Sequence, residues 1–399
     1  MRNWFEHLQD RLSTWHAEGL ARELKVAEGA GVRFKLRSQE VLSFASNDYL
    51  GLSTHPQVVA AAKAALERSG AGATASPLIV GHKSEHVELE SALAAFKQSE
   101  AALVFASGYQ AALASLGALA GAEDTILLDR LAHASLLDGA RLSGARVRTF
   151  KHNDLADLER VLGRELGDDP HGPKPRAKRR AIVVVESLYS MDGDAAPLAE
   201  LVAVTERAGA LLLVDEAHAT GVLGETGRGG LERITKERGG LPEHVVAMGT
   251  LSKALGSQGG FICARKLVTD TIVHSGRAYL FSTALAPAAA AAAHAALKLV
   301  DAEPQRRERL LALAQAVRAS LRAAQLSVLP GTGPIIPVLA GSEQQATAWS
   351  EALLKQGIYV PAIRYPTVKK GQARLRISLS AGHSEADCAA LLGAMKAEG

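Results

Sequence analysis

The sequence predicts an α/β fold in which a large, mostly parallel sheet is accompanied by a smaller α+β domain. Seven short apolar runs between residues 101 and 264 alternate with stretches whose apolar residues recur at helical spacing. Strands that are apolar throughout and alternate with helices are typical of a parallel sheet covered on both faces. The chain has 399 residues, of which 47% are hydrophobic, so it has enough apolar material for more than one core.

The elements are expected in the following order. The strands of the large sheet are expected at Ala102–Ala106, Thr125–Leu128, Arg146–Phe150, Ala181–Val185, Ala210–Val214, His244–Met248 and Gly260–Cys263. Helices are expected at Leu155–Leu166, Pro197–Ala208, Pro287–Asp301 and Gln305–Ala324, followed by the strand Pro334–Leu339, the helix Glu343–Gln356, the strand Ala373–Leu379 and a final helix. We therefore expect an N-terminal helix and small-domain segment at residues 1–55, a large domain at 56–290 and a C-terminal small α+β domain at 291–399.

Charge and composition exclude several classes of protein. The formal net charge is +3, which is too small for a protein that binds nucleic acid through a concentrated basic surface. Two uncharged stretches, 101–122 and 278–297, are interrupted by polar residues, glycine and proline, so we expect buried segments and no membrane span. Only Cys263 and Cys388 are present, which excludes a disulfide framework. The N-terminus lacks an apolar signal core, so a cytoplasmic location is expected.

Three segments carry candidate chemistry at the ends of expected strands. Asp215 closes an apolar strand, where open α/β sheets bind ligands, although a helix cap or turn would also explain an aspartate there. His218 follows three residues later and on its own is more often structural. Lys253 follows another apolar strand among small polar residues and glycines, a setting in which a desolvated lysine acts as a nucleophile and base.

The third segment is a turn from a strand into a helix. It runs through Ser107, Gly108 and Tyr109, and the free N–H groups at such a helix start bind phosphate. A phosphate site, a carboxylate for a ring nitrogen and a Schiff-base lysine together are what pyridoxal 5′-phosphate (PLP) requires. His133, after the strand TILLD, has a flat ring that suits stacking on this cofactor, with a core or capping histidine as the alternative.

Other motifs are absent or weak. The glycine runs lack the G-x-G-x-x-G spacing of a dinucleotide site, and the chain has no H-E-x-x-H or G-x-S-x-G. His82 and His86 are four residues apart, but no third ligand is visible, so we interpret them as a surface pair and expect no metal site.

Taken together, these motifs resemble the α-oxoamine synthases, which are PLP-dependent enzymes of fold type I with the architecture of aspartate aminotransferase. The resemblance rests on ALVFASGYQAAL, DRLAHASLLDGARLSGA, ESLYSMDGDAAPL, VDEAHATGVLGETGRG and GTLSKALGSQGG, with SFASNDYLGL before them and AIRYPTVKKGQARLRISLSAGH after them. It covers nearly the whole chain. SMDGDAAPL and the PTV before ARLRISLS are most similar to the family member that joins L-alanine to a pimeloyl thioester in biotin synthesis.

The resemblance implies roles for individual residues. Lys253 would form the Schiff base, Asp215 would pair with the pyridine nitrogen, His218 would bind the ring hydroxyl, and His133 would stack on the ring as a fourth catalytic residue. The resemblance assigns further cofactor contacts to Ser107, Gly108, Tyr109, Ser190, Thr250, Ser282 and Thr283. The last two would reach the phosphate of the neighbouring subunit, which implies a homodimer with shared sites. It assigns substrate contacts to Arg22, Asn47, His133, Thr367 and Arg376.

Two features depart from the family pattern. Pro77 stands where the family commonly has an arginine, so that arginine's acyl-donor or interface contact is not carried over. The basic stretch 174–180 is longer than usual, and its charges are most simply a solvated surface; the alternative is that they bind an acidic donor, coenzyme A or a carrier protein.

Several functions remain open from the sequence. The resemblance favours condensation of L-alanine with pimeloyl-CoA or a pimeloyl-carrier protein, with loss of carbon dioxide. The alternatives within the family use glycine, as 2-amino-3-ketobutyrate CoA ligase and 5-aminolevulinate synthase do. A catalytically inactive regulatory subunit with this fold is the alternative outside enzymes, and it is expected to lack the lysine that is present here at 253.

Overall fold

The computed structural model describes residues 3–167 and 179–398. The chain divides into two compact units, a larger one of Leu50–Ser190 and Asp194–Glu308, and a smaller one of Met1–Tyr49, Met191–Gly193 and Arg309–Gly399. The division after residue 308 comes later than the expected one after residue 290, because α11 (Pro287–Ala302) packs against α2 (Pro56–Ser69) and α3 (Ser84–Lys97) of the larger unit. The N-terminal division falls at 49/50, a few residues before the expected 55/56.

The larger unit is built on a seven-stranded sheet with the order β4-β10-β9-β8-β7-β5-β6. The strands are β4 (Ala101–Phe105), β5 (Thr125–Asp129), β6 (Arg146–Phe150), β7 (Ala181–Glu186), β8 (Leu211–Asp215), β9 (Val245–Thr250) and β10 (Gly260–Ala264). β10 runs antiparallel to both of its neighbours, β4 and β9, and the other pairs of neighbouring strands in this sheet are parallel. Each of the seven expected strands is present, and the prediction of a mostly parallel sheet is confirmed.

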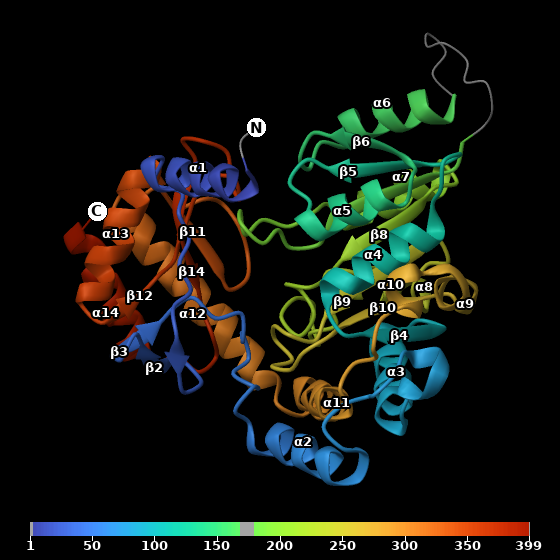
Figure 1. Ribbon diagram of the computed structural model, residues 1–399, viewed down its shortest axis with the longest axis horizontal. Helices are drawn as coiled ribbons and strands as arrows, with labels where there is room; N and C mark the ends of the chain where they lie inside the picture. Colours follow the sequence, from blue (N-terminus) through green and yellow to red (C-terminus); the bar gives the residue numbers. More distant parts are fainter. Residues whose placement is uncertain (1–2, 168–178, 399) are drawn as a thin grey trace. The chain divides into compact units, whose positions relative to one another are not determined.

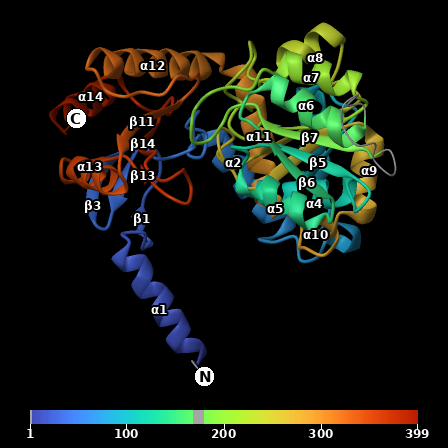
Figure 2. The same ribbon diagram turned by 90° about the horizontal axis from the view of Figure 1, so that it is seen from above.

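Helices cover both faces of this sheet, because alternate residues of each strand point to opposite faces. On one face, α4 (Gly108–Leu119), α5 (Ala134–Leu142), α9 (Lys266–Ser275) and α10 (Arg277–Leu280) pack on apolar strand residues such as Leu128, Val184 and Leu213. α6 (Leu155–Leu166) and α7 (Leu198–Arg207) lie over the other face (Figure 2). The remaining helices are α8 (Glu232–Arg238) and a π-helical turn, η1 (Pro77–Gly81).

The smaller unit combines two small sheets with helices (Figure 1). One sheet has the order β1-β2-β3-β12 and the other the order β11-β14-β13. The strands are β1 (Ala27–Glu28), β2 (Arg33–Leu36), β3 (Gln39–Ser43), β11 (Ile335–Gly341), β12 (Ile358–Tyr359), β13 (Ala362–Ile363) and β14 (Ala373–Ser378). The helices are α1 (Trp4–Ala17), α13 (Glu343–Lys355), α14 (Glu385–Glu398) and most of α12 (Pro304–Ala323). The expected α+β composition is therefore present.

The uncharged stretches 101–122 and 278–297 fold into β4 with α4 and into α10 with α11. Among the described residues, none of the helices is long and apolar enough to cross a membrane.

Candidate active site

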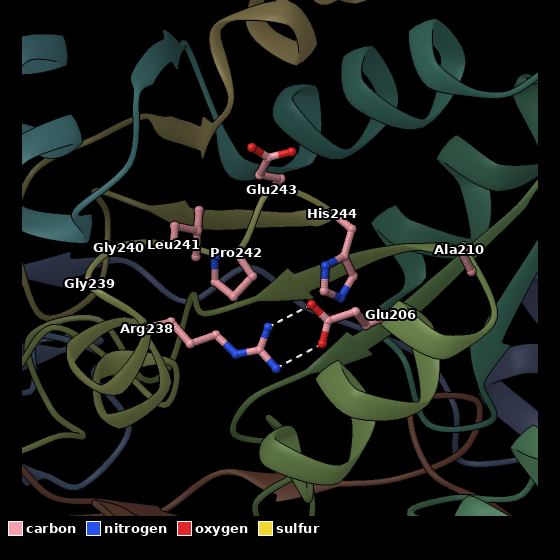
Figure 3. A pocket seen from close by; sticks show the side chains of 10 residues that line it. Glu206, Ala210, Arg238, Gly239, Gly240, Leu241, Pro242, Glu243 and His244 are labelled. Atoms are coloured by element: carbon pink, nitrogen blue, oxygen red, sulfur yellow. Dashed lines mark hydrogen bonds and ion pairs between the residues drawn. The ribbon is translucent and has the colours of Figure 1, made fainter.

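The two edges of the seven-stranded sheet differ in how their charged groups are paired. At the amino edge, a groove of about 740 Å³ is lined by residues that precede β8 and β9. There Arg238 donates two hydrogen bonds to Glu206, at 2.7 and 2.8 Å (Figure 3), and Arg265 pairs with Glu243 at 2.8 Å. Charges that neutralise one another in this way are typical of a structural surface. The candidate site is at the carboxyl edge, where open α/β sheets bind ligands.

Two buried carboxyl groups lie next to each other at this carboxyl edge. Glu186 ends β7, Asp215 ends β8, and the two residues are partners in the parallel register. They are 2% and 5% exposed. Burial, together with the charge of Asp215, raises the pKa of Glu186 to about 8, so this carboxyl group keeps its proton at neutral pH. Burial also raises the pKa of Asp215, against the attraction of Lys253.

These two carboxyl groups receive few contacts from the protein. Oδ1 of Asp215 accepts a hydrogen bond from the Ala217 N–H at 2.8 Å, and Oε2 of Glu186 accepts one from the Ser190 N–H at 3.3 Å. Oε1 of Glu186 is buried and has no hydrogen-bond partner within residues 3–167 and 179–398. A buried acid in such a position either stays protonated or binds a cationic group from outside.

Lys253 and His218 complete the centre of the site. Lys253 lies in the loop after β9, and its Nζ is 2.8 Å from Nε2 of His218, which is buried just after β8. The charge of Lys253 acts on both Asp215 and His133. The structure therefore brings Lys253 to Asp215 and His218, although 35 residues separate Lys253 from the histidine in the sequence.

The start of α4 forms the expected strand-to-helix turn. Ser107 caps the helix, and its Oγ accepts a hydrogen bond from the Gln110 N–H at 3.1 Å. Gly260 of β10 lies against this turn, and a Cβ there would be 2.5 Å from the carbonyl oxygen of Ser107 and 2.6 Å from Cα of Gly108. Only glycine permits this close approach. The first N–H groups of such a helix are available to a phosphate.

His133 and Thr250 lie beyond or at the ends of two strands of the sheet, β5 and β9. His133 caps α5, and its Nδ1 is 2.8 Å from Oγ of Ser135. Burial lowers the pKa of His133, and so does Lys253, so the ring is neutral at neutral pH. Thr250 ends β9 and donates a hydrogen bond to the Gly259 carbonyl at 2.7 Å, while its Oγ1 is 3.5 Å from the position of a Cβ on Gly108.

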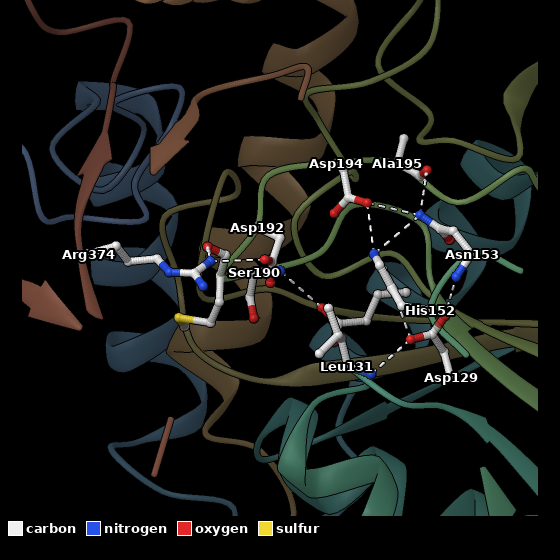
Figure 4. Close-up of polar contacts among 11 residues, drawn as sticks. Asp129, Leu131, His152, Asn153, Ser190, Asp192, Asp194, Ala195 and Arg374 are labelled. Atoms are coloured by element: carbon white, nitrogen blue, oxygen red, sulfur yellow. Dashed lines mark hydrogen bonds and ion pairs between the residues drawn. The ribbon is translucent and has the colours of Figure 1, made fainter. Parts of the chain in front are cut away.

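The segment that follows Ser190 is held in place by the protonated side chain of His152. Nδ1 of His152 is 2.9 Å from Oδ1 of Asp129, and its Nε2 is 2.8 Å from Oδ2 of Asp194 (Figure 4). Because both nitrogens face carboxylates, both must carry protons, and the two carboxylates raise the pKa of His152 to about 10 despite its burial. Asn153 adds a hydrogen bond to Asp194 at 2.9 Å. The cluster fixes the chain just beyond Ser190 to the ends of β5 and β6.

A buried ion pair supports the end of β8. Nζ of Lys97 is 2.6 Å from Oε2 of Glu216 and 2.9 Å from Oγ1 of Thr220. Oε1 of Glu216 accepts a hydrogen bond from the Leu231 N–H at 3.0 Å. Since Glu216 directly follows Asp215, this pair fixes the backbone that carries the candidate cofactor aspartate.

Three expected cofactor residues lie on or near the surface of the larger unit. Tyr109 is 47% exposed and donates a hydrogen bond to Asp138 at 2.6 Å. Thr283 is exposed and Ser282 is half-buried in the segment after α10. The side chain of Gln110 in α4 donates to the Ala278 carbonyl of α10, at 2.5 Å, so this segment begins beside the start of α4.

The expected substrate residues belong to the smaller unit. Arg376 of β14 is buried and donates hydrogen bonds to Oδ1 of Asn47 at 3.2 and 3.3 Å, and to Oγ of Ser378 at 2.8 Å. The predicted pair of Arg376 and Asn47 is thus in direct contact. Thr367 is exposed in the loop between β13 and β14, and Arg22 is exposed between α1 and β1.

Of the two departures from the family pattern, the structure describes Pro77 and the last two residues of the basic stretch. Pro77 begins η1, whose next three residues are exposed. Residues 174–178 of the basic stretch lie outside the described residues. Arg180 at its end donates two hydrogen bonds to Asp124, at 2.8 and 3.1 Å, which is a structural contact at the amino edge of the sheet.

Sequence reasoning missed several of these residues. It did not single out Glu186, although this residue ends an expected strand and lies beside Asp215 in the register. Lys97 and His152 gave no signal because their partners are remote in sequence. His86 was interpreted as part of a surface pair and is instead 1% exposed, with its Nε2 2.7 Å from the Leu285 carbonyl oxygen.

Comparison with known proteins shows the family. The model of the family "Aminotransferase class I and II" matches residues 39–395. An 8-amino-7-oxononanoate synthase of Methylobacterium nodulans is 46% identical over 386 residues, covering 96% of this chain and 94% of the relative. A serine palmitoyltransferase from S. paucimobilis, with a bound PLP–myriocin aldimine, superposes with a TM-score of 0.89 at 32% identity, covering 100% and 98% of the two chains. An 8-amino-7-oxononanoate synthase from Francisella tularensis gives 0.74 at 27% identity, covering 90% and 97%.

The chain therefore belongs to the aminotransferase class I and II family, and it is a PLP-dependent enzyme of fold type I. Within this class, the curated relatives that match it at 42–46% identity are 8-amino-7-oxononanoate synthases. The residues at the carboxyl edge fit the cofactor: Asp215 is a buried acid that needs a cationic partner, Lys253 supplies an amine, and the start of α4 supplies phosphate-binding N–H groups.

Proposed function

We propose that this protein condenses L-alanine with a pimeloyl thioester, with loss of carbon dioxide, to form 8-amino-7-oxononanoate for biotin biosynthesis in the cytoplasm. The observation that carries the proposal is the contact of Lys253 with His218 beside the buried Asp215, in a chain similar over almost its whole length to enzymes of that name. The donor is pimeloyl-CoA or a pimeloyl-carrier protein.

The cofactor and the chain have separate tasks in this reaction. PLP, when bound, withdraws electrons from the α-carbon of an amino acid attached to it. Asp215 would hold the pyridine nitrogen, His218 the ring hydroxyl, and the start of α4 the phosphate, with Ser190 and Thr250 adding contacts. His133, whose ring is neutral at neutral pH, would lie flat against the cofactor.

Lys253 moves the protons. Its amine would hold the cofactor in the resting enzyme, and once alanine takes that place it would remove the proton from the α-carbon through Nζ. His218, 2.8 Å from this nitrogen, would keep it oriented. Arg376 would bind the alanine carboxylate through its guanidinium fork, with Asn47 beside it. Arg22 and Thr367 would contact the substrates.

We propose that the enzyme is a homodimer in which Ser282 and Thr283 reach the partner's cofactor phosphate. Leu78, Ile79 and Val80 of η1 are 54%, 73% and 60% exposed, and Phe281, next to Ser282, is 74% exposed. Since α10 packs against η1, these apolar side chains belong to one region of the larger unit. An exposed apolar region of this kind is typical of a protein interface.

A panel of amino acids and donors tests the reaction. Alanine, glycine and serine are each combined with pimeloyl-CoA, pimeloyl-carrier protein and shorter acyl-CoAs, and release of free thiol is followed. We expect the fastest release with alanine and a pimeloyl donor. A preference for glycine would favour the glycine-using relatives, and thiol release with no amino acid preference would refute the proposal.

Mixing two inactive variants tests the shared site. Lys253→Ala and Thr283→Ala subunits are combined under conditions in which the dimer exchanges. Partial recovery of activity is expected, because one of the two sites in the mixed dimer then has only intact residues. Ultracentrifugation of Ile79→Asp, which should favour the monomer, checks the interface.

A further inference from the structure

A cavity in the smaller unit has four side chains with hydrogen-bond donors in its lining. It has a volume of about 490 Å³ and lies between the C-terminal half of α12 and the loop before β11. Its polar side chains are those of Gln315, Arg318, Arg322 and Thr332, and none of the residues that line it is acidic. The volume is in the range of small-molecule sites.

Arg318 is the unusual residue of this cavity. It is only 8% exposed, and its Nη2 donates hydrogen bonds to the carbonyl oxygens of Gly333 and Ile335, at 3.2 and 3.0 Å. Its Nε is enclosed and has no hydrogen-bond partner among the described residues. Its Nη1 makes no hydrogen bond to these residues either, yet it is not among the enclosed atoms, so it is the nitrogen open to the cavity.

The charge of Arg318 lacks a counterion in the part of the chain that the structure describes. Burial lowers its pKa, and the one charged group that adds to this effect is another guanidinium, that of Arg322. Arg322 lies one helical turn further on the same face of α12, is exposed, and has its Nη2 3.4 Å from the Leu329 carbonyl oxygen. The C-terminal end of the helix dipole compensates part of this charge. A buried cation with no anion is otherwise unfavourable.

We propose that this cavity is a binding site for a phosphate group, held between Arg318 and Arg322. Two guanidinium groups on one helix face offer the several N–H donors that a tetrahedral oxyanion accepts. The Thr332 hydroxyl and the Gln315 amide add neutral donors at the rim. The volume exceeds what inorganic phosphate alone requires, so the natural ligand is a small phosphate ester. The site shares no residue with those assigned to PLP and does not depend on the proposed reaction.

Inorganic phosphate is the first probe, and it is tested on the PLP-loaded enzyme. Loading is necessary because the empty cofactor site would itself bind phosphate. Calorimetric titration at constant ionic strength should show saturable binding by the wild type. Arg322→Gln should weaken it by about tenfold, the effect of losing one charged hydrogen-bond partner. Because Arg322 is exposed, this variant should fold normally, which circular dichroism checks.

A matched variant controls for general effects of charge and salt. Arg233→Gln removes the same charge from an exposed arginine of α8, and its phosphate binding should equal that of the wild type. Equal affinities of Arg322→Gln and Arg233→Gln for phosphate would overturn the proposal, as would absence of saturable binding. Glycerol phosphate should bind more tightly than inorganic phosphate. Tighter binding of succinate than of either would overturn the assignment to phosphate.

Discussion

Two pairs of acidic residues at the carboxyl edge of the large sheet differ in how the protein neutralises their charges. Asp129 and Asp194 have the imidazolium of His152 between them, with bonds of 2.9 and 2.8 Å. Glu186 and Asp215 lie side by side at the ends of β7 and β8, and within the described residues their carboxyl groups accept hydrogen bonds from backbone N–H groups, with no imidazolium between them. The pKa of Asp129 is lowered by His152 and nearby N–H groups despite its burial, whereas burial raises those of Glu186 and Asp215.

This difference separates a structural cluster from a binding site. The protein neutralises the first pair itself, which fixes the segment that carries Ser190. In the second pair Glu186 keeps its proton, and burial of Asp215 outweighs the attraction of Lys253 for its charge. A protonated pyridine nitrogen would stabilise this carboxylate further. Carboxyl groups whose pKa values are raised by burial beside a specific charged group are typical of functional sites.

The largest loss of activity is expected when Lys253, the cation that acts on Asp215, is replaced. Lys253→Ala should lower the rate of thiol release by at least about 10³-fold, because a positioned proton-transfer group alone contributes about 10²–10⁴-fold. The substitution also removes the amine that holds the cofactor, so the absorption of the PLP–lysine Schiff base should disappear. Lys236→Ala, at an exposed lysine that pairs with Glu225, should change neither. Normal activity of Lys253→Ala would refute the enzymatic mechanism.

The two acid pairs can be compared directly by replacing one acid in each with its amide. In the cofactor-free protein, Asp215→Asn should raise the free energy of unfolding by about 1 kcal/mol, because burial of the carboxylate costs more than the attraction of Lys253 restores. Asp129→Asn should lower it by about 3 kcal/mol, because the charge of His152 then loses a partner. Denaturant titrations measure both. Asp215→Asn should also reduce activity by about 10²-fold or more. Destabilisation by both variants to the same extent would contradict the comparison.

Replacing His152 is expected to have a smaller effect on activity and an effect on the free energy of unfolding that depends on pH. Its pKa of about 10 is above the ordinary value near 6.5, so the stability that its charge contributes is complete below about pH 6.5 and is lost as the pH rises through about 10. His152→Gln should therefore cost about 3 kcal/mol at pH 6 and progressively less towards pH 10. Urea titrations of both proteins across this range give the difference.

The same variant tests the link to Ser190. Loss of the bond to Asp194 should weaken PLP binding severalfold at neutral pH. His55→Gln, at a histidine that caps α2, provides a comparison in the same unit. A constant stability difference between wild type and His152→Gln across the pH range would show that the imidazolium is not the stabilising species.

The sequence was sufficient to predict the seven strands of the large sheet and the candidate residues at the ends of several of them. Apolar runs identify the strands because most of them are buried on both faces; the edge strand β6, with only Phe150 buried, is the exception. A polar residue that directly follows such a run is placed at the carboxyl edge. This rule alone indicates Asp215 and Lys253, without the resemblance to a family. His133 and Ser107 followed from the same reasoning about strand ends and helix starts.

The remaining features depend on contacts between remote residues. Lys97 and Glu216 are 119 residues apart, and Asp129 and His152 are 23 apart, so no local pattern indicates that either pair forms. Glu186 was missed for a related reason: its pKa is raised by burial and by Asp215, which becomes its neighbour only through the register of β7 and β8. The sequence of a single strand does not indicate which strands become its neighbours in a parallel sheet.

The smallest effect is expected at the opposite edge of the sheet, where Glu206 and Arg238 pair in the groove of about 740 Å³. Their side chains are 49% and 40% exposed, so water and salt screen their attraction. Arg238→Gln should change the free energy of unfolding by less than about 1 kcal/mol and leave PLP affinity and thiol release unaltered. The groove is larger than many binding sites. This variant therefore tests whether the volume of a cavity or the chemistry of its side chains identifies a functional site. A substantial loss of activity would show that charges paired with one another at the amino edge also take part in function, and the contrast between paired and unpaired acids would then no longer identify the site.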